Sequence, residues 1–424
     1  MKDFYKEIEW RGFIHTCTPE VDKHLRAKKI TAYIGFDPSA PSLHVGSLLP
    51  IMGLVHFQRA GHIPIAVAGG GTGMVGDPSG KTQERRLLSI EELQYNLEGI
   101  QKQLSQFLDF NVKSNPARLV NNAEWLTKIT LMDFLREIGK YFSINEMLAK
   151  ESVKNRIEQE QGMSFTEFTY SLLQSYDYLQ LFDRYNCTLQ MGGSDQWGNI
   201  TSGIDIIRRL RGVDVHGIVF PLITTSSGIK FGKTESGTVW LDGNLTSPYK
   251  FYQFWYNTDD KDVIRYLKYF TLLSQDEIAE LENKVKSAPE KREAQIALAK
   301  EVTRILHGEA ALAQAQKASA IFFGGEITEV SNNELIDIFS DVPSCEISKN
   351  LFAGEGYPIV ELVVTAGIAK SKSEARRIIQ GGGIYLNNKR VENVDQKISI
   401  SHSIHGKYLV LRKGGRNYFL IKIK

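Results

Sequence analysis

The chain has 424 residues, 42% of them hydrophobic and 24% charged, a balance typical of a globular protein with two or three domains. No apolar run approaches the roughly 18 residues that cross a bilayer, and the N-terminus lacks an apolar stretch with a cleavage site, so we expect neither a membrane protein nor a secreted one. The net charge is only +2, and three widely spaced cysteines, Cys17, Cys187 and Cys345, favour a cytoplasmic protein without a disulfide framework or a zinc site.

Strand-like and helix-like stretches alternate in the N-terminal half. Buried strands are predicted at 30–36 and 63–68, and the apolar-faced stretch 48–60 between them predicts a helix. A long helix is predicted at 90–107 and a later strand at 219–225. This alternation favours a mostly parallel sheet with helices on both faces, joined by right-handed crossovers.

The pattern changes in the second half of the chain. Residues from about 248 to 320 read as helical, and a stretch containing Gly324-Gly325 and Pro343 reads as a partly flexible connection. Beyond it, 13 Lys and Arg stand against 5 Asp and Glu, whereas the rest of the chain is mildly acidic. Such a basic module could contact nucleic acid, although solvated charge on an ordinary domain explains it equally well. We therefore predict four segments, which are an α/β domain at 1–225, a helical domain at 226–322, a linker at 323–354 and a basic domain at 355–424.

Gly35–Ser47 (GFDPSAPSLHVGS) stands between the first predicted strand and the first predicted helix. Open α/β sheets bind ligands at this position, and a helix N-terminus attracts phosphate. His44 could donate to phosphate oxygens, and Gly46 would let a flat base approach the backbone. A turn with a capping serine would look the same.

Ile65–Gly76 (IAVAGGGTGMVG) contains the G-x-G-x-x-G pattern of dinucleotide-binding proteins, which raises the alternative of an oxidoreductase. That fingerprint should open a helix at once, whereas Asp77–Gly80 continues in turn chemistry. No acidic strand end follows about 20 residues later, since Glu91 and Glu92 lie in helical sequence. The context therefore argues against a dehydrogenase.

Three further patterns could bind a polar ligand. Tyr170, Gln174 and Asp177 fall on one face of a predicted helix, where a phenol, an amide and a carboxylate could read a small molecule. In Gln190–Asn199 (QMGGSDQWGN) paired glycines permit close backbone approach, and Asp195 could hold ribose hydroxyls. Gly228–Thr234 (GIKFGKT) offers two lysines that suit a polyphosphate. A solvated helix face, a glycine turn and a surface hairpin are the respective alternatives.

Together, in order and spacing, these motifs resemble those of bacterial tyrosyl-tRNA synthetases, a branch of the class I aminoacyl-tRNA synthetases. His44–Ser47 resembles the class I HIGH signature, and Lys230–Thr234 the family's form of KMSKS. Gly192–Asn199 and Gly76–Gly80 resemble the tyrosine branch specifically. The resemblance implies an α/β, Rossmann-like parallel-sheet catalytic domain, then a helical anticodon-side domain and a small α+β RNA-binding domain of S-four type. One departure is Ser47, which replaces the second histidine of the signature and lacks the reach of an imidazole.

The resemblance also implies an activity, in which tyrosine is activated with ATP and transferred to the 3′ end of tRNA(Tyr). It implies that Tyr33 and Asp177 hydrogen-bond the phenolic hydroxyl of the substrate tyrosine. The α-amino group of the substrate would be held by Asp77, Tyr170 and Gln174, with Gln190 and Gln196 nearby. The ATP site would comprise Asp37, Ser39, His44, Gly46, Gly193, Asp195 and Lys233. The residues that would act on the transition state are His44, Ser47, Lys81, Arg85, Lys230, Lys233 and Thr234. Mg²⁺ would arrive with the ATP phosphates, without an all-protein metal site.

Residues 357–424 resemble the S-four-type RNA-binding domain, most clearly at Leu362–Asn387. A helix is predicted at 371–379 with Ser371 as its cap, and Lys372 and Arg376 on one face. A solvated helix face is the competing interpretation. The candidate phosphate contacts are Lys370, Lys372, Arg376, Arg377 and Lys389.

Two other functions compete with this interpretation. A non-catalytic RNA-binding protein would not need His44, the paired lysines or the tyrosine pocket. A tryptophanyl enzyme shares the architecture, and Tyr33 with Asp177 favours a phenol over an indole, although a carboxylate could also accept from an indole N–H. The resemblance implies a homodimer, for which Leu131–Leu135 and Phe165 are interface candidates that could equally be core.

Overall fold

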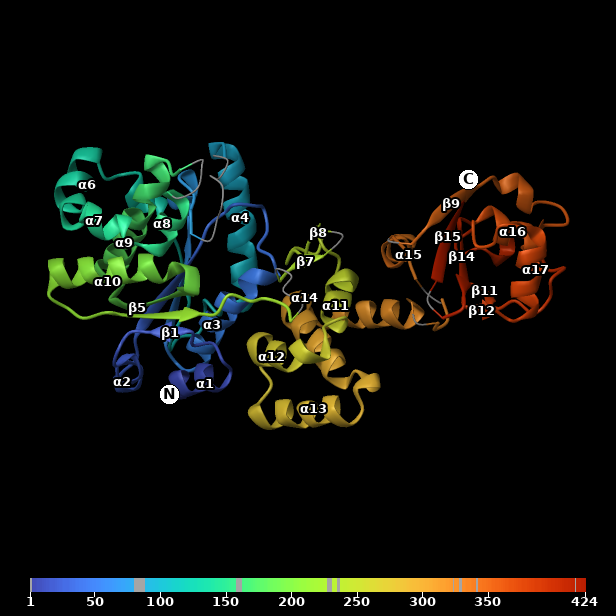
Figure 1. Ribbon diagram of the computed structural model, residues 1–424, viewed down its shortest axis with the longest axis horizontal. Helices are drawn as coiled ribbons and strands as arrows, with labels where there is room; N and C mark the ends of the chain where they lie inside the picture. The colour runs from blue at the N-terminus through green and yellow to red at the C-terminus, as the bar shows by residue number, and fades with distance from the viewer. Residues whose placement is uncertain are drawn as a thin grey trace. The chain divides into compact units, whose positions relative to one another are not determined.

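The structure is a computed structural model that describes residues 2–79, 88–157, 162–226, 231–234, 237–322, 324–327, 330–340, 342–415 and 417–424. The chain folds into two compact units, the first formed by Met1–Thr246 with Tyr256–Leu306 and the second by Ser247–Trp255 with His307–Lys424 (Figure 1). Among the described helices, none combines the length and apolar character that crossing a bilayer requires.

A six-stranded sheet, in the order β1-β6-β5-β2-β3-β4, forms the centre of the first unit. All neighbours run parallel except β1, which pairs antiparallel with β6. The predicted parallel sheet is confirmed, and the strand expected at 219–225 ends at Phe220 because Pro221 cannot donate to a ladder. The strands are β1 (Thr16–Cys17), β2 (Thr31–Phe36), β3 (Ile63–Ala68), β4 (Arg118–Asn121), β5 (Cys187–Gly193) and β6 (His216–Phe220).

Helices cover both faces of this sheet (Figure 1). Strands β2, β3 and β4 follow one another in one direction and β5 and β6 in the other, so right-handed crossovers place α3 and α4 on one face and α9 and α10 on the opposite face. The direction in which successive strands are added to the sheet therefore reverses between β2 and β5, which leaves a crevice at their carboxyl ends. The four helices are α3 (Leu48–Arg59), α4 (Ile90–Phe107), α9 (Phe165–Tyr185) and α10 (Trp197–Arg211).

Residues 256–306 belong to this first unit, although the sequence groups them with a separate helical domain. Helix α12 (Asp260–Phe270) is fastened to the N-terminal segment by the buried guanidinium of Arg11. That group donates to three carbonyls at the end of α12, those of Lys268, Thr271 and Leu273, at 2.7–3.0 Å.

The remaining elements of the first unit are α1 (Phe4–Trp10), α2 (Val21–Ala27), α5 (Ala123–Leu126), α6 (Leu131–Glu137), α7 (Ile144–Leu148), α8 (Glu151–Ile157), α13 (Gln275–Ser287), β7 (Lys233–Thr234) and β8 (Gly237–Thr238).

The second unit contains a five-stranded sheet in the order β12-β11-β14-β15-β9. The segment 323–354, expected to be a linker, contains α15 and β9, and β9 extends this sheet by pairing parallel with β15. Helix α17 begins after Ser371, whose hydroxyl accepts from the Glu374 N–H, which confirms the predicted cap. Helix α14 (Glu293–Phe322, with a break at Gly308) belongs to the first unit up to Leu306 and to the second from His307. The other elements of the second unit are α11 (Pro248–Tyr256), α15 (Asn332–Ile338), β9 (Ser344–Ile347), β10 (Tyr357–Pro358), α16 (Ile359–Thr365), α17 (Lys372–Gln380), β11 (Ile384–Leu386), β12 (Lys389–Arg390), β13 (Lys397–Ile398), β14 (Tyr408–Lys413) and β15 (Asn417–Ile423).

Candidate active site

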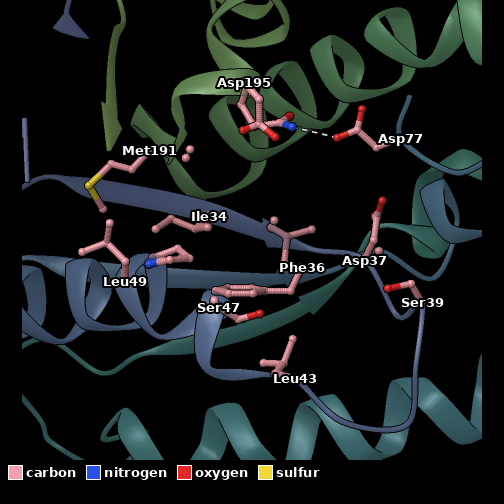
Figure 2. A pocket seen from close by; sticks show the side chains of 18 of the residues that line it. Ile34, Phe36, Asp37, Ser39, Leu43, Ser47, Leu49, Asp77, Met191 and Asp195 are labelled. Atoms are coloured by element: carbon pink, nitrogen blue, oxygen red, sulfur yellow. Dashed lines mark hydrogen bonds between the residues drawn. The ribbon is translucent and has the colours of Figure 1, made fainter. Parts of the chain in front are cut away.

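A cavity of about 530 Å³ lies at the carboxyl ends of β2 and β5, where the strand order reverses (Figure 2). Its lining includes fourteen of the residues singled out in the sequence, which are Tyr33, Asp37, Ser39, His44, Gly46, Ser47, Asp77, Tyr170, Gln174, Asp177, Gln190, Gly193, Asp195 and Gln196. Lys81, Arg85 and Lys230 lie outside the described residues, and Lys233 and Thr234 are described only as backbone in β7. The roles predicted for these five residues stay predictions.

The closed end of the cavity contains buried polar groups, and two of them have no hydrogen-bond partner among the described residues. Asp177 on α9 is 4% exposed, and its two oxygens accept from Trp125 Nε1 at 2.7 Å and from Asn122 Nδ2 at 2.9 Å. The hydroxyl of Tyr33 and Oε1 of Gln190 are also buried, yet neither hydrogen-bonds to any described residue. Because an unpaired buried polar group is destabilising, these two groups are arranged for a ligand with its own donor and acceptor.

Burial raises the pKa of Asp177 to about 7, against the opposing effect of the hydrogen bonds from Asn122 and Trp125, and the charge of Asp37 raises it further. Burial also raises the pKa of Tyr33 well above its ordinary value, so the phenol is neutral at pH 7. In the ligand-free protein, Asp177 therefore changes protonation close to neutral pH. A ligand that donates a hydrogen bond to this carboxylate favours the ionised form.

We expect this titration to appear in ligand binding. If the phenol of a bound tyrosine donates to ionised Asp177, the dissociation constant for tyrosine should rise about tenfold as the pH falls from 8 to 6. The reason is that only about a tenth of the carboxyl groups are ionised one unit below the pKa. Equilibrium dialysis of tyrosine without ATP measures this. A flat profile over that range would contradict it, and an Asp177→Asn variant should lose the dependence.

Carboxylates and amides surround the next part of the cavity. Asp37 accepts from the Tyr170 hydroxyl at 3.0 Å, and Asp77 accepts from Gln196 Nε2 at 2.7 Å, the bond dashed in Figure 2. Gln174 Oε1 accepts from an amide on α10 at 2.9 Å. The family resemblance assigns Asp37 to ATP and Tyr170 to the α-amino group, and in the structure these two side chains are hydrogen-bonded to each other. Two carboxylates lining one cavity suit an ammonium group.

At the open end, His44 caps the 3₁₀ turn Val45–Ser47. Its Nδ1 accepts from the Gly46 N–H at 3.0 Å, which assigns the proton of the neutral ring to Nε2 and leaves Nε2 as a donor. A Cβ at residue 46 would lie 2.7 Å from Cε1 of this ring, so a side chain there would push the imidazole out of this position. A Cβ on Gly193 would likewise lie 2.7 Å from Oδ1 of Asp195.

The candidate RNA contacts lie on the surface of the second unit. Lys370, Lys372, Arg376 and Arg377 are exposed at the start and along the face of α17, and Lys389 is exposed on β12. Lys372 forms an ion pair with Glu361. An exposed basic set of this kind is compatible with phosphate contacts, and the assignment stays a prediction.

Comparison with known proteins decides the family. Residues 25–324 match the family model described as tRNA synthetases class I (W and Y), and residues 334–421 match a tyrosine--tRNA ligase SYY-like C-terminal domain. The chain belongs to the class I tRNA synthetases of the W and Y type.

Relatives in this synthetase family align over the whole chain. The tyrosine--tRNA ligase of Roseiflexus castenholzii is 55% identical over 423 residues and covers 100% of both chains, and that of Geobacillus stearothermophilus is 49% identical and covers 99% of both. The crystal structure of a C-terminally truncated Aspergillus nidulans mitochondrial tyrosyl-tRNA synthetase superposes with a TM-score of 0.69 at 33% identity, over 76% of this chain and 95% of that one.

The site of this class I synthetase includes residues that sequence reasoning missed. Asn122 and Trp125 hold Asp177, Thr72 donates to Asp37 at 3.0 Å, and Trp240 pairs with His44 across an isolated bridge. Asn122 directly follows β4, and the position after a parallel strand could have suggested it. Trp240 carries no such signal, because its place depends on a contact between distant segments. No cluster of three or more His, Cys, Asp or Glu in the described chain is arranged to hold a metal ion.

Proposed function

We propose that this synthetase is a tyrosine–tRNA ligase, which activates L-tyrosine with ATP and transfers the tyrosyl group to the 3′ end of tRNA(Tyr). The observation that carries the proposal is the buried, unpaired hydroxyl of Tyr33 in the same closed end as the Asp177 carboxylate. A phenol can accept from the first and donate to the second, whereas phenylalanine would leave both without a ligand partner. Relatives named tyrosine--tRNA ligase, 49–55% identical over the full length, support the same activity.

In the activation step, a carboxylate oxygen of tyrosine forms a bond to the α-phosphorus of ATP, and the bond to the leaving pyrophosphate breaks. Asp77, Tyr170 and Gln174 would hold the α-ammonium group, with Asp37 accepting from the Tyr170 hydroxyl beside them, so that the carboxylate is presented to the phosphate. His44, through Nε2–H, would donate to phosphate oxygens as negative charge develops on them. No side chain of the cavity has to act as a covalent nucleophile.

The remaining roles rest on the family resemblance. Gly193 and Asp195 would bind the adenosine part, with Ser39 and Gly46. The side chains proposed to act on the leaving pyrophosphate are Lys81, Arg85, Lys230, Lys233 and Thr234, and Ser47 stands where the signature has a second histidine. Mg²⁺ would enter as part of the substrate, bound to the ATP phosphates. In the second step a terminal ribose hydroxyl of the tRNA takes the tyrosyl group, and AMP leaves.

We further propose that the enzyme is a cytoplasmic homodimer that contacts tRNA phosphates through the basic surface of its second unit. The dimer is supported by apolar side chains that the structure leaves on the surface, because Phe165 is 78% and Met132 72% exposed and neither is core. Others are Leu131, Leu135 and Ile144. Sedimentation at micromolar concentration measures this, and a monomer would remove the proposal. The free thiols of Cys17, Cys187 and Cys345 accord with a reducing compartment.

The activity is tested by ATP–pyrophosphate exchange with each of the twenty amino acids. We expect exchange with tyrosine alone, largely lost in a Lys233→Ala variant. Exchange with tryptophan would move the chain to the other branch of the family. If well-folded protein supports no exchange with any amino acid, the non-catalytic RNA-binding alternative becomes the better account, and Ser47 is the first residue to examine.

A further inference from the structure

Helix α4 holds the segment that precedes His44 through a buried glutamine. Gln103 is 5% exposed, and both ends of its amide are paired. Oε1 accepts from the Leu43 N–H at 2.8 Å, and Nε2 donates to Oγ of Ser42, also at 2.8 Å. Leu43 lies at the lower edge of the cavity in Figure 2. The buried amide thus fixes the backbone immediately before the signature histidine.

Two more residues on the same face of α4 contact this segment. Asn96 is buried and donates to the Pro38 carbonyl at 3.1 Å. A Cβ on Gly99 would lie 2.1 Å from the carbonyl oxygen of Pro41, so glycine is needed for the close approach. Positions 96, 99 and 103 fall on one face of a helix. The face of α4 is therefore fitted to the backbone of residues 38–43.

Ser42 extends the contact to a segment distant in sequence. Its hydroxyl, 3% exposed, accepts from the Asp242 N–H at 3.1 Å in addition to Gln103, and donates to the Leu43 carbonyl at 2.7 Å. The same carbonyl accepts from the Leu241 N–H at 2.9 Å. One buried hydroxyl therefore joins α4, the histidine segment and residues 241–242.

The joined segment also reaches the lysine motif. Val239 O accepts from the Val45 N–H at 3.0 Å, while Val239 N donates to the Gly232 carbonyl at 3.1 Å. Gly232 belongs to the KFGKT motif, adopts φ of +83°, and a Cβ there would lie 2.7 Å from Cγ2 of Val45. Backbone hydrogen bonds thus connect the histidine signature to the lysine signature through residues 239–242.

We propose that Gln103, acting through Ser42, is a positioning residue for adenylate formation. The pair holds the His44 segment in register with residues 239–242, and hence both phosphate-binding signatures in one fixed arrangement. The inference rests on the proposed function and adds to it a residue that contacts neither substrate. Because the closed end of the tyrosine pocket, with Tyr33, Asp177 and Gln190, is built from β2, α9 and β5, tyrosine binding should be insensitive to this register.

Replacing Gln103 with leucine removes both hydrogen bonds and leaves the Leu43 N–H without its buried partner. We expect the rate of tyrosyl-adenylate formation at saturating tyrosine and ATP, measured by rapid quench, to fall about 10–100-fold, since a small misplacement of reacting groups has effects of that size. The dissociation constant for tyrosine should stay within about twofold, because that site is not touched. Gln106→Leu, the same change at an exposed position of α4, is the matched control and should equal the wild type.

A second variant guards against misfolding. Ser42→Ala removes the shared hydroxyl, should slow the same step, and should add little to Gln103→Leu, because residues of one network are not additive. Tyrosine binding shows whether a variant is folded. If Gln103→Leu binds no tyrosine, the rate of adenylate formation by Ser42→Ala tests the proposal in its place. Unchanged rates in the folded variants, or losses in tyrosine affinity that match the losses in rate, overturn the inference. If the wild-type chain shows no tyrosine-dependent exchange, the proposed function fails instead.

Discussion

Asp177→Asn is expected to lower kcat/KM for tyrosine by about 10²–10³-fold, the loss that follows when a hydrogen bond to a buried charge is removed and a neighbouring donor is left unpaired. The carboxylate accepts from both Trp125 and Asn122, and a phenol would be a third donor. Asparagine offers one carbonyl oxygen in place of two, so at least one donor loses a good partner. The loss should appear mainly in tyrosine affinity.

The same variant should lose selectivity. Phenylalanine has no hydroxyl to pair with residue 177, so its small kcat/KM should change much less than that of tyrosine, and the ratio between the two should fall. Asp183→Asn is a matched control, because Asp183 lies on the same helix but is exposed and paired with Arg211. The assignment of the phenol site would be wrong if Asp177→Asn kept wild-type tyrosine affinity and selectivity.

His44→Ala is expected to lower kcat for ATP–pyrophosphate exchange by about 10²–10³-fold, the usual effect of removing one donor aimed at developing charge. His44→Asn separates the two jobs of this side chain, because an asparagine oxygen can still cap Gly46 N–H but cannot reach where Nε2 lies. We therefore expect both variants to be slow, with similar KM values for tyrosine.

A second histidine provides the control for this experiment. His402, in the other unit, also accepts a backbone N–H through Nδ1, from Ser399 at 3.1 Å. Changing His402 to asparagine makes the same replacement at a capping histidine without touching the cavity, and exchange should be unaffected. If His44→Asn were as active as the wild type, capping would be the only role of His44, and the charge-stabilising role would have to pass to other groups.

Much of the architecture was determined by local patterns. The alternation of buried strands and amphipathic helices predicted the parallel sheet, and α4 begins and ends where the pattern placed it, with Ser89 and Glu92 closing a capping box. The motifs near His44 and at 190–199 pointed to one crevice because parallel strands bring their carboxyl ends together. Periodicity carries this information because it reflects only which face of an element is buried.

The tertiary structure alone decided which side chains meet. Nothing in the sequence shows that Tyr33 stays unpaired beside Asp177, that Tyr170 bonds Asp37, or that burial brings the pKa of Asp177 to about 7. Residues 256–306 belong to the first unit, and the buried guanidinium of Arg11 fastens them to it by donating to carbonyls about 260 positions along the chain. Gln103 reads as one more polar residue on an amphipathic helix. Hydrogen bonds between distant segments leave no periodic trace in sequence, so the register of the two signatures and the electrostatics of the pocket are properties of the folded chain.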